Sequence, residues 1–98
     1  MDGVFKALAD PTRRKILRLL GEKERSAGEL TNVFPISAPS MSHHFTVLKN
    51  AGLVETRRAG QQIVYSLNTT AFQDLLGSLM EIFSKPGDGS KDADGATS

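Results

Sequence analysis

The sequence predicts a mainly α-helical domain with one small β-hairpin. Helix start signals recur between residues 10 and 37, and a tight Ala-Gly turn later separates two short runs with β-strand character. With 98 residues, the chain can form one domain and bury only a modest core. A partner subunit would therefore add considerably to its buried apolar surface.

Two helices are expected at the beginning of the chain. Apolar residues one turn apart within residues 4–8 predict a short first helix. Asp10 and Pro11 then form a strong start signal, with Asp as the N-cap and Pro at the first helical position. The second helix is expected to continue through Leu20 and to end at Gly21.

Two further helices follow, each with its own capping residues. Ser26 and Glu29 have the spacing of a capping box, which predicts a short third helix. Ser37 is expected to cap a fourth helix, in which Pro39 is tolerated because it lies in the first turn. Gly52 is expected to end this fourth helix.

A β-hairpin and a last helix complete the domain. Leu53–Arg58 and Gln61–Leu67 are predicted strands around an Ala59-Gly60 turn, because apolar and polar residues alternate in the second run. Asn68 and the two threonines after it offer N-caps for the last helix. Four helices, a hairpin and a helix in this order make a winged helix-turn-helix.

The fourth helix, residues 38–51, has two chemically different sides. At about 100° per residue, Met41, Phe45 and Leu48 form an apolar stripe, while the opposite side is polar and lacks acids. Such a face can enter the major groove of double-stranded DNA. A solvated polar face is the commoner meaning of one such helix, but the flanking elements favour DNA. The residues expected to contact DNA are Pro39, Ser40, Ser42, His43, Thr46, Lys49 and Asn50.

The hairpin, residues 53–67, forms the wing of this arrangement. Arg57 and Arg58 precede the tight turn, and Gln61 and Gln62 follow it. Arginines at a hairpin tip suit phosphates or a narrow minor groove, so we expect at least one arginine and the glutamines to contact DNA. A charged edge that prevents pairing with other strands is a second interpretation, and it is compatible with the first.

Two adjacent histidines and a basic cluster need separate interpretation. His43 and His44 do not form a chelating pair, because neighbouring residues of a helix point about 100° apart. His44 is instead expected to be a hydrogen-bonded histidine at the edge of the core. In the second helix, Arg13 is expected to be partly buried and paired with an acid, while Arg14 and Arg18 face solvent.

Composition narrows the possible classes of protein. The chain has no cysteine, which excludes disulfides and thiolate metal sites. It shows no signal segment and no apolar run of membrane length, so we expect a soluble cytoplasmic protein. Residues 86–98 are expected to be a disordered acidic tail after a folded domain of residues 1–85. The net charge of the whole chain is +1, and the tail contributes −2. The domain therefore has a net charge of +3 and is mildly basic.

Several segments of the chain resemble the ArsR-type bacterial repressors. They are LADPTRRKILRLL, GEL in the third helix, SMSHHFTVLKNAGLV and the wing RRAGQQIVYSL. DPTRRKIL, SHH with LK, and YSLNTT are most similar to the SdpR-type branch, which has no metal site. The resemblance implies a homodimer that binds a palindromic operator and represses transcription by blocking polymerase.

The resemblance also implies that the first and last helices pack across the two-fold axis of the homodimer. The sequence supports a dimer independently, because the last helix is apolar on more than one side and one small domain does not suffice to cover it. The residues expected at this interface are Val4, Phe5, Leu8, Phe72, Leu75, Leu76, Leu79, Met80 and Phe83.

The chain departs from the metal-sensing members of this family. Those members use a Cys-x-Cys on the third helix, or Asp and His ligands on the last helix. Here the third helix reads AGELTNVF, and the last helix has Asp74 and Glu81 but no histidine, which makes a poor transition-metal site. We therefore expect no metal and no cofactor. The inducer stays open between a small molecule, a partner protein and none.

Two other functions compete with DNA binding. Winged helices also serve as protein-interaction modules, but that function predicts a more apolar exposed face on the fourth helix. An enzyme is the weakest alternative. Ser42 beside His43 and His44 resembles part of a catalytic triad, but the chain offers neither the orienting partner nor a pocket loop.

Overall fold

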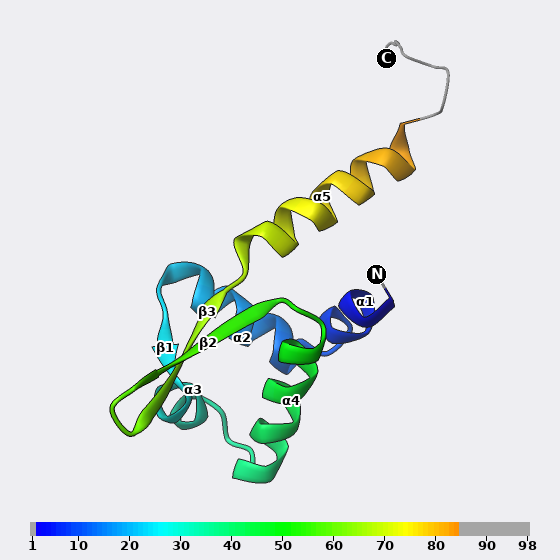
Figure 1. Cartoon of the computed structure of the whole chain (residues 1–98). Coiled ribbons are helices and arrows are strands. Elements are labelled where there is room, and N and C mark those ends of the chain that lie inside the picture. The colour runs from blue at the N-terminus through cyan, green and yellow to red at the C-terminus, as the bar shows by residue number, and fades with distance from the viewer. Residues whose placement is uncertain (1, 85–98) are drawn as a thin grey trace.

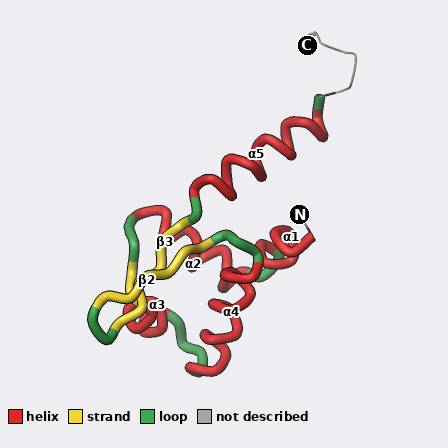
Figure 2. The backbone as a smooth tube through the Cα atoms, viewed as in Figure 1, coloured by secondary structure: helices red, strands yellow, loops and turns green. Residues whose placement is uncertain are grey.

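The computed structural model describes residues 2–84 of the chain. The elements are α1 (Asp2–Leu8), α2 (Pro11–Glu22), β1 (Arg25–Ser26), α3 (Ala27–Val33), α4 (Ala38–Asn50), β2 (Val54–Ala59), β3 (Gln62–Leu67) and α5 (Thr69–Phe83). Figures 1 and 2 show that helices make up most of the fold, with one small sheet among them. The expected winged helix-turn-helix is confirmed. The expected disordered tail, residues 86–98, lies outside the described residues.

The three strands form an antiparallel sheet in the order β1-β3-β2. β2 and β3 make the wing, and Ala59 pairs with Gln62 at its tip. On the inner face of the sheet, the ring of Tyr65 packs on Phe45 of α4, with the ring centroids 4.7 Å apart. Burial raises the pKa of Tyr65, so its hydroxyl stays neutral at this contact. The aromatic pair ties the wing to α4.

One apolar core joins α2, α3, α4 and the wing. Its largest completely buried side chains are Ile16, Leu30, Met41, Leu48 and Leu53. Complete burial of a side chain of this size contributes about 1.5–3 kcal/mol. Since α4 supplies Met41 and Leu48, its inner side is packed into the core and its outer side faces solvent.

The N-caps predicted from the sequence are present. The Asp10 carboxylate accepts the backbone N–H of Arg13 at 3.0 Å, and Ser37 caps α4 in the same way. Ser26 and Glu29 exchange the two hydrogen bonds of a capping box, at 3.1 and 2.8 Å. The hydrogen bond from the Ser26 backbone lowers the pKa of Glu29, because it favours the charged carboxylate.

The C-terminal end of α4 is also as expected. Gly52 follows the helix with a φ of +77°, a left-handed conformation that favours glycine. The backbone N–H of Gly52 donates to the Lys49 carbonyl at 2.9 Å, and that of Leu53 donates to the Leu48 carbonyl at 3.1 Å. These bonds make a Schellman motif, which satisfies carbonyls at the end of the helix.

The end of α2 differs from the sequence expectation. Gly21 does not end the helix, which continues to Glu22. The backbone N–H of Lys23 still donates to the Leu19 carbonyl at 3.4 Å. Gly21 is not among the described glycines with positive φ, so it lacks the left-handed conformation that would make it a cap.

The expected hairpin is shifted by one residue, and one strand was missed. The two turn residues are Gly60 and Gln61 rather than Ala59 and Gly60, and Gly60 has a φ of +64° at the first turn position. The missed strand is Arg25–Ser26, which pairs with the outer edge of β3. Two residues are too few to show an alternating pattern in the sequence.

The last helix, α5, leaves the sheet and projects away from the other elements (Figure 1). Asn68 caps it by accepting the backbone N–H of Ala71 at 3.3 Å. Leu75 is buried, whereas Leu76 is 61% and Phe83 is 82% exposed. Within residues 2–84, no helix has the length and hydropathy needed to cross a membrane.

Candidate nucleic-acid interface

The outer face of α4 is a continuous exposed polar surface. Each α4 residue expected at DNA is exposed, while Met41, Phe45 and Leu48 on the inner side are buried. The helix contains no acid, and Lys49 lies in its last turn. Phosphates beside this face would meet no carboxylate of α4, which favours close approach to DNA because no like charge repels the backbone.

The polar groups of this face differ in what they already contact. The Ser37 hydroxyl donates to the Ser40 hydroxyl at 3.0 Å and accepts the Ser40 backbone N–H at 3.2 Å, so Ser40 is engaged at the N-cap. Ser42, His43 and Thr46 make no side-chain hydrogen bond within the described residues. They present unused donors and acceptors, which the edges of bases can match.

A buried arginine connects α1, α2 and α4. Arg13 of α2 donates from Nε to the Ala7 carbonyl at 2.8 Å and from Nη2 to the Lys6 carbonyl at 3.0 Å. Its Nη1 lies 3.1 Å from Nδ1 of His44 on α4. Because a guanidinium only donates, Nδ1 of His44 is the acceptor in this contact. We call this set of four residues the Arg13 junction.

The Arg13 junction confirms one expectation and corrects another. His44 is half-buried and hydrogen-bonded, as expected. Arg13 is buried, but the partners of its side chain are carbonyls and His44 rather than an acid. Asp10 caps α2 instead, and its carboxylate lies 3.8 Å from Nδ1 of His44. Desolvation raises the pKa of Asp10, but the hydrogen bond from the Arg13 backbone N–H and the nearby positive charge of Arg13 outweigh it, and the pKa is lowered.

The two wing arginines belong to opposite faces of the sheet. Arg57 forms an ion pair with Glu24, which lies just before β1. Arg58 is the register partner of Ile63, whose side chain packs against the core, so Arg58 shares the inner face of the sheet. Both arginines are exposed. Arg58 therefore shares the side of the sheet on which α4 lies, whereas Arg57 is held by an acid.

The tip of the wing carries the two glutamines expected at DNA. Gln61 lies in the turn and Gln62 begins β3, and both are exposed. A two-residue turn places them at the end of the hairpin, beyond the buried part of the sheet. Their amides offer donors and acceptors but no charge, so they suit phosphate or sugar contacts better than long-range attraction.

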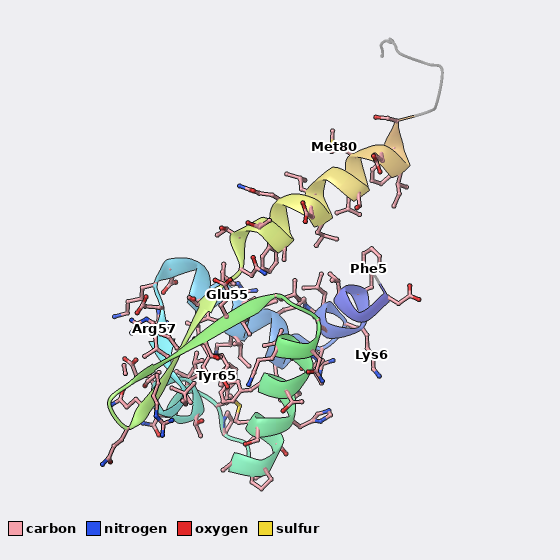
Figure 3. The ribbon with its side chains drawn as sticks, in the orientation of Figure 1. Phe5, Lys6, Glu55, Arg57, Tyr65 and Met80 are labelled. Carbon is pink, nitrogen blue, oxygen red and sulfur yellow. The ribbon has the colours of Figure 1, made fainter. Side chains whose placement is uncertain are left out.

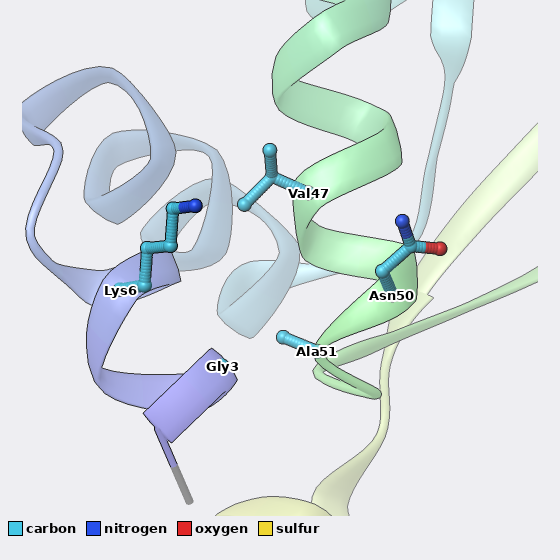
Figure 4. Close-up of a pocket in the computed structure, with 5 residues that line it drawn as sticks. All are labelled: Gly3, Lys6, Val47, Asn50 and Ala51. Carbon is cyan, nitrogen blue, oxygen red and sulfur yellow. The ribbon is translucent and has the colours of Figure 1, made fainter.

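A small hollow lies between α1 and the C-terminal part of α4 (Figure 4). Its volume is about 180 Å³, and it is lined by Gly3, Lys6, Val47, Asn50 and Ala51. Asn50 was expected at DNA, but sequence reasoning did not single out Lys6. The sequence showed only a single lysine in the predicted first helix. Its role in a site can be inferred only once the position of α1 beside α4 is known.

Acids and histidines are dispersed over the structure. Within residues 2–84, no group of three or more His, Asp or Glu side chains could hold a metal ion. The rings of His43 and His44 are 5.9 Å apart and inclined at 54°. Asp74 and Glu81 are both exposed on α5.

The residues expected at a dimer interface differ in exposure. The exposed members are Phe5, Leu76, Met80 and Phe83. The half-buried members are Val4, Leu8, Phe72 and Leu79. Leu75 is buried within the single chain and has little surface left to offer a partner. Ile82, which is 67% exposed, was not among the expected residues but extends the same apolar surface.

The chain is similar to known regulators over most of its length. Residues 8–57 match a family described as a helix-turn-helix domain. The transcriptional repressor SdpR of Bacillus subtilis is 48% identical over 85 residues, which cover 87% of this chain and 94% of that protein. The HTH-type transcriptional regulator Rv2034 of Mycobacterium tuberculosis is 43% identical over 74 residues, which cover 76% of this chain and 69% of that protein. An ArsR-like transcriptional regulator from Rhodococcus sp. RHA1 has a TM-score of 0.76 at 33% identity, covering 84% of this chain and 77% of that one.

Proposed function

The chain belongs to the ArsR family of winged helix-turn-helix transcriptional regulators, and we propose that it represses transcription by binding a palindromic operator as a homodimer. Members of this family are DNA-binding regulators and not enzymes. The observation that carries the proposal is the acid-free outer face of α4. The core and the Arg13 junction contact the inner side of this helix and hold it in place.

In this proposal α4 enters the major groove. Ser42, His43 and Thr46 reach base edges, because they are exposed and their hydrogen-bonding groups are unused within the described residues. Lys49 and Asn50 lie further along the helix and contact bases or phosphates. Short side chains suit this face, because they let the helix approach the bases closely.

The wing contacts the DNA backbone or the minor groove. Arg58 is the favoured contact, because it shares the inner face of the sheet with α4. Arg57 reaches DNA only by leaving Glu24, an exchange of one exposed ion pair for another that costs little. Gln61 and Gln62 support the contact from the tip.

The dimer is proposed to form through α1 and α5. The exposed apolar residues Phe5, Leu76, Met80 and Phe83 support this, because a partner subunit would remove them from water. Two-fold symmetry would place the α4 helices in successive major grooves, about 34–36 Å apart. Repression then follows from exclusion of polymerase in the cytoplasm. We further propose that no metal controls this step, and the inducing signal stays open.

The test is selective binding. Duplexes selected from a random pool by the wild-type protein should contain a two-fold repeat, bound far more tightly than a shuffled duplex in fluorescence anisotropy. Ser42→Ala or His43→Ala should weaken the selected duplex by about 5- to 150-fold for each half-site, the 1–3 kcal/mol of a base contact, and the shuffled duplex much less. Thr70→Ala, at an exposed polar position on α5, is the matched control and should change neither.

Equal losses on both duplexes would refute the base-contact assignment for that residue. A protein that selects no sequence and binds no duplex at moderate salt would refute the proposed function itself. Such a result would favour the protein-interaction module, in which the same surfaces dock another protein.

A further inference from the structure

We propose that Lys6 and Asn50 form a phosphate-binding site at the hollow between α1 and α4, through which α1 contacts the DNA backbone. This inference rests on the proposed function and adds α1 to the DNA-binding surface. The family resemblance assigns α1 to the dimer interface alone.

The hollow has the composition of an anion site. Lys6 brings an ammonium group and Asn50 an amide, while Gly3, Val47 and Ala51 form the rest of the lining (Figure 4). No acid lines it, and none of the ion pairs within residues 2–84 includes Lys6. Small lining residues let a phosphate approach the backbone closely. A Cβ added at Gly3 would meet no atom within 4 Å, so the hollow is open on that side.

Lys6 lies on the opposite side of α1 from the apolar surface. Figure 3 shows Phe5 pointing toward the side of α5, where the partner subunit is proposed to dock, and Lys6 pointing away from it. Asn50 belongs to the polar face of α4 that is proposed to enter the major groove. A lysine beside the end of that face lies where the phosphates at the rim of the groove would pass.

The backbone of Lys6 is held in place by the Arg13 junction. Its carbonyl accepts Nη2 of Arg13 at 3.0 Å, and Nη1 of the same guanidinium reaches His44 of α4 at 3.1 Å. The backbone of Lys6 is therefore fixed with respect to the helix that would read the bases. The carbonyls of Leu48 and Lys49 are occupied by the Schellman motif, which reduces their repulsion of an anion.

The experiment measures how DNA binding depends on salt. Each phosphate contact contributes a slope of about 0.9 in log K against log salt, so loss of one contact per protomer should lower the slope of the dimer by about 2. At about 0.1 M salt, the same relation gives an affinity loss of about 8-fold per contact, or about 60-fold for two. Lys6→Gln should show both changes on the selected and the shuffled duplex, and Lys6→Arg should restore the slope.

Lys23→Gln is the matched control, because Lys23 is an exposed lysine at the end of α2, away from α4 (Figure 1). Sedimentation at the same protein concentrations should give one mass for wild type, Lys6→Gln and Lys23→Gln. A scan of duplexes with single neutral methylphosphonates should then find a position that weakens wild type but not Lys6→Gln. That position identifies the phosphate held by Lys6.

Each other outcome overturns the inference. If wild type binds the selected duplex tightly and Lys6→Gln keeps its salt slope, α1 does not contact DNA, and the proposed function stands without it. If inorganic phosphate at constant ionic strength shifts the amide resonances of Gly3, Val47 and Ala51 saturably while the salt slope is unchanged, the hollow holds a small anion instead. If wild type binds no duplex, the proposed function fails first.

Discussion

Replacing Arg13 by methionine tests whether the Arg13 junction holds α1 on the rest of the domain. Methionine keeps much of the apolar length of the side chain but cannot donate the hydrogen bonds at 2.8, 3.0 and 3.1 Å. Hydrogen bonds from a charged donor contribute about 1.5–3 kcal/mol each, so a simple sum would give about 4.5–9 kcal/mol. That sum is too large, because α1 can detach and expose its carbonyls to water.

The destabilisation caused by Arg13→Met therefore cannot exceed the free energy with which α1 packs on the rest of the domain. Ala7 is completely buried, and Val4 and Leu8 are half-buried. Two half-buried side chains of this size and one alanine contribute about 2–4 kcal/mol. We expect Arg13→Met to lower the free energy of unfolding by this amount and to remove hydrogen-exchange protection from the amides of α1, with protection in α2–α4 reduced only through the global loss.

The measurements are urea titrations followed by circular dichroism, together with native-state hydrogen exchange. Protein concentrations must be matched, because dimer formation shifts apparent stability. Arg14→Met is the control, since exposed Arg14 donates a single bond, at 2.9 Å to the Leu8 carbonyl, and should cost at most about 1 kcal/mol. Losses of equal size in the two variants, or α1 amides that stay protected in Arg13→Met, would refute the reasoning.

Three further predictions concern the wing, the caps and α5. Glu24→Ala should change the free energy of unfolding by less than about 0.5 kcal/mol in urea titrations, because its pair with Arg57 is exposed. It should also steepen the salt dependence of DNA binding, and an unchanged slope would show that Glu24 does not hold Arg57 back from the phosphates. Asp10→Asn keeps an N-cap but removes a carboxylate whose pKa is lowered by folding. That charge contributes its full stabilisation above the ordinary pKa of about 3.9, and the contribution is lost as the pH falls below this value. Urea titrations from about pH 4.5 to 2.5 should therefore show a smaller decrease in the free energy of unfolding for Asp10→Asn than for wild type. Equal decreases in the two proteins would contradict this. Phe83→Glu should shift sedimentation toward the monomer with the helical signal retained, and an unchanged mass would exclude this end of α5 from the interface.

Local capping chemistry explains why most of the fold could be predicted from the sequence. Asp10, Ser26 and Ser37 each accept a backbone N–H from a residue three positions later, so the signal and its partner lie within one turn. Gly52 is equally local, since its positive φ ends the helix directly before it. The prediction that α2 ends at Gly21 was wrong, because glycine permits a left-handed conformation without requiring it, and α2 continues to Glu22.

The parts that sequence reasoning missed all depend on contacts between distant residues. Nothing near Arg13 indicates that its partner on α4 is His44, which is 31 positions away. The same holds for Arg57 and Glu24, 33 positions apart, whose pairing separates the roles of two adjacent arginines. Lys6 had no distinguishing neighbour in the sequence, and only the packing of α1 beside α4 makes it part of a site.

These contacts give α1 a position that its own sequence cannot maintain. It has 7 residues, fewer than the roughly 12–15 that even a favourable isolated helix needs in water. Its last carbonyls are instead satisfied by Arg13 and Arg14. If Phe5 meets the partner subunit and Lys6 meets DNA, then the Arg13 junction couples dimer geometry to operator binding. An inducer must bind one dimer arrangement more tightly than another. Arg13→Met should accordingly weaken dimerisation and operator affinity together, and loss of only one would show that α1 does not link them.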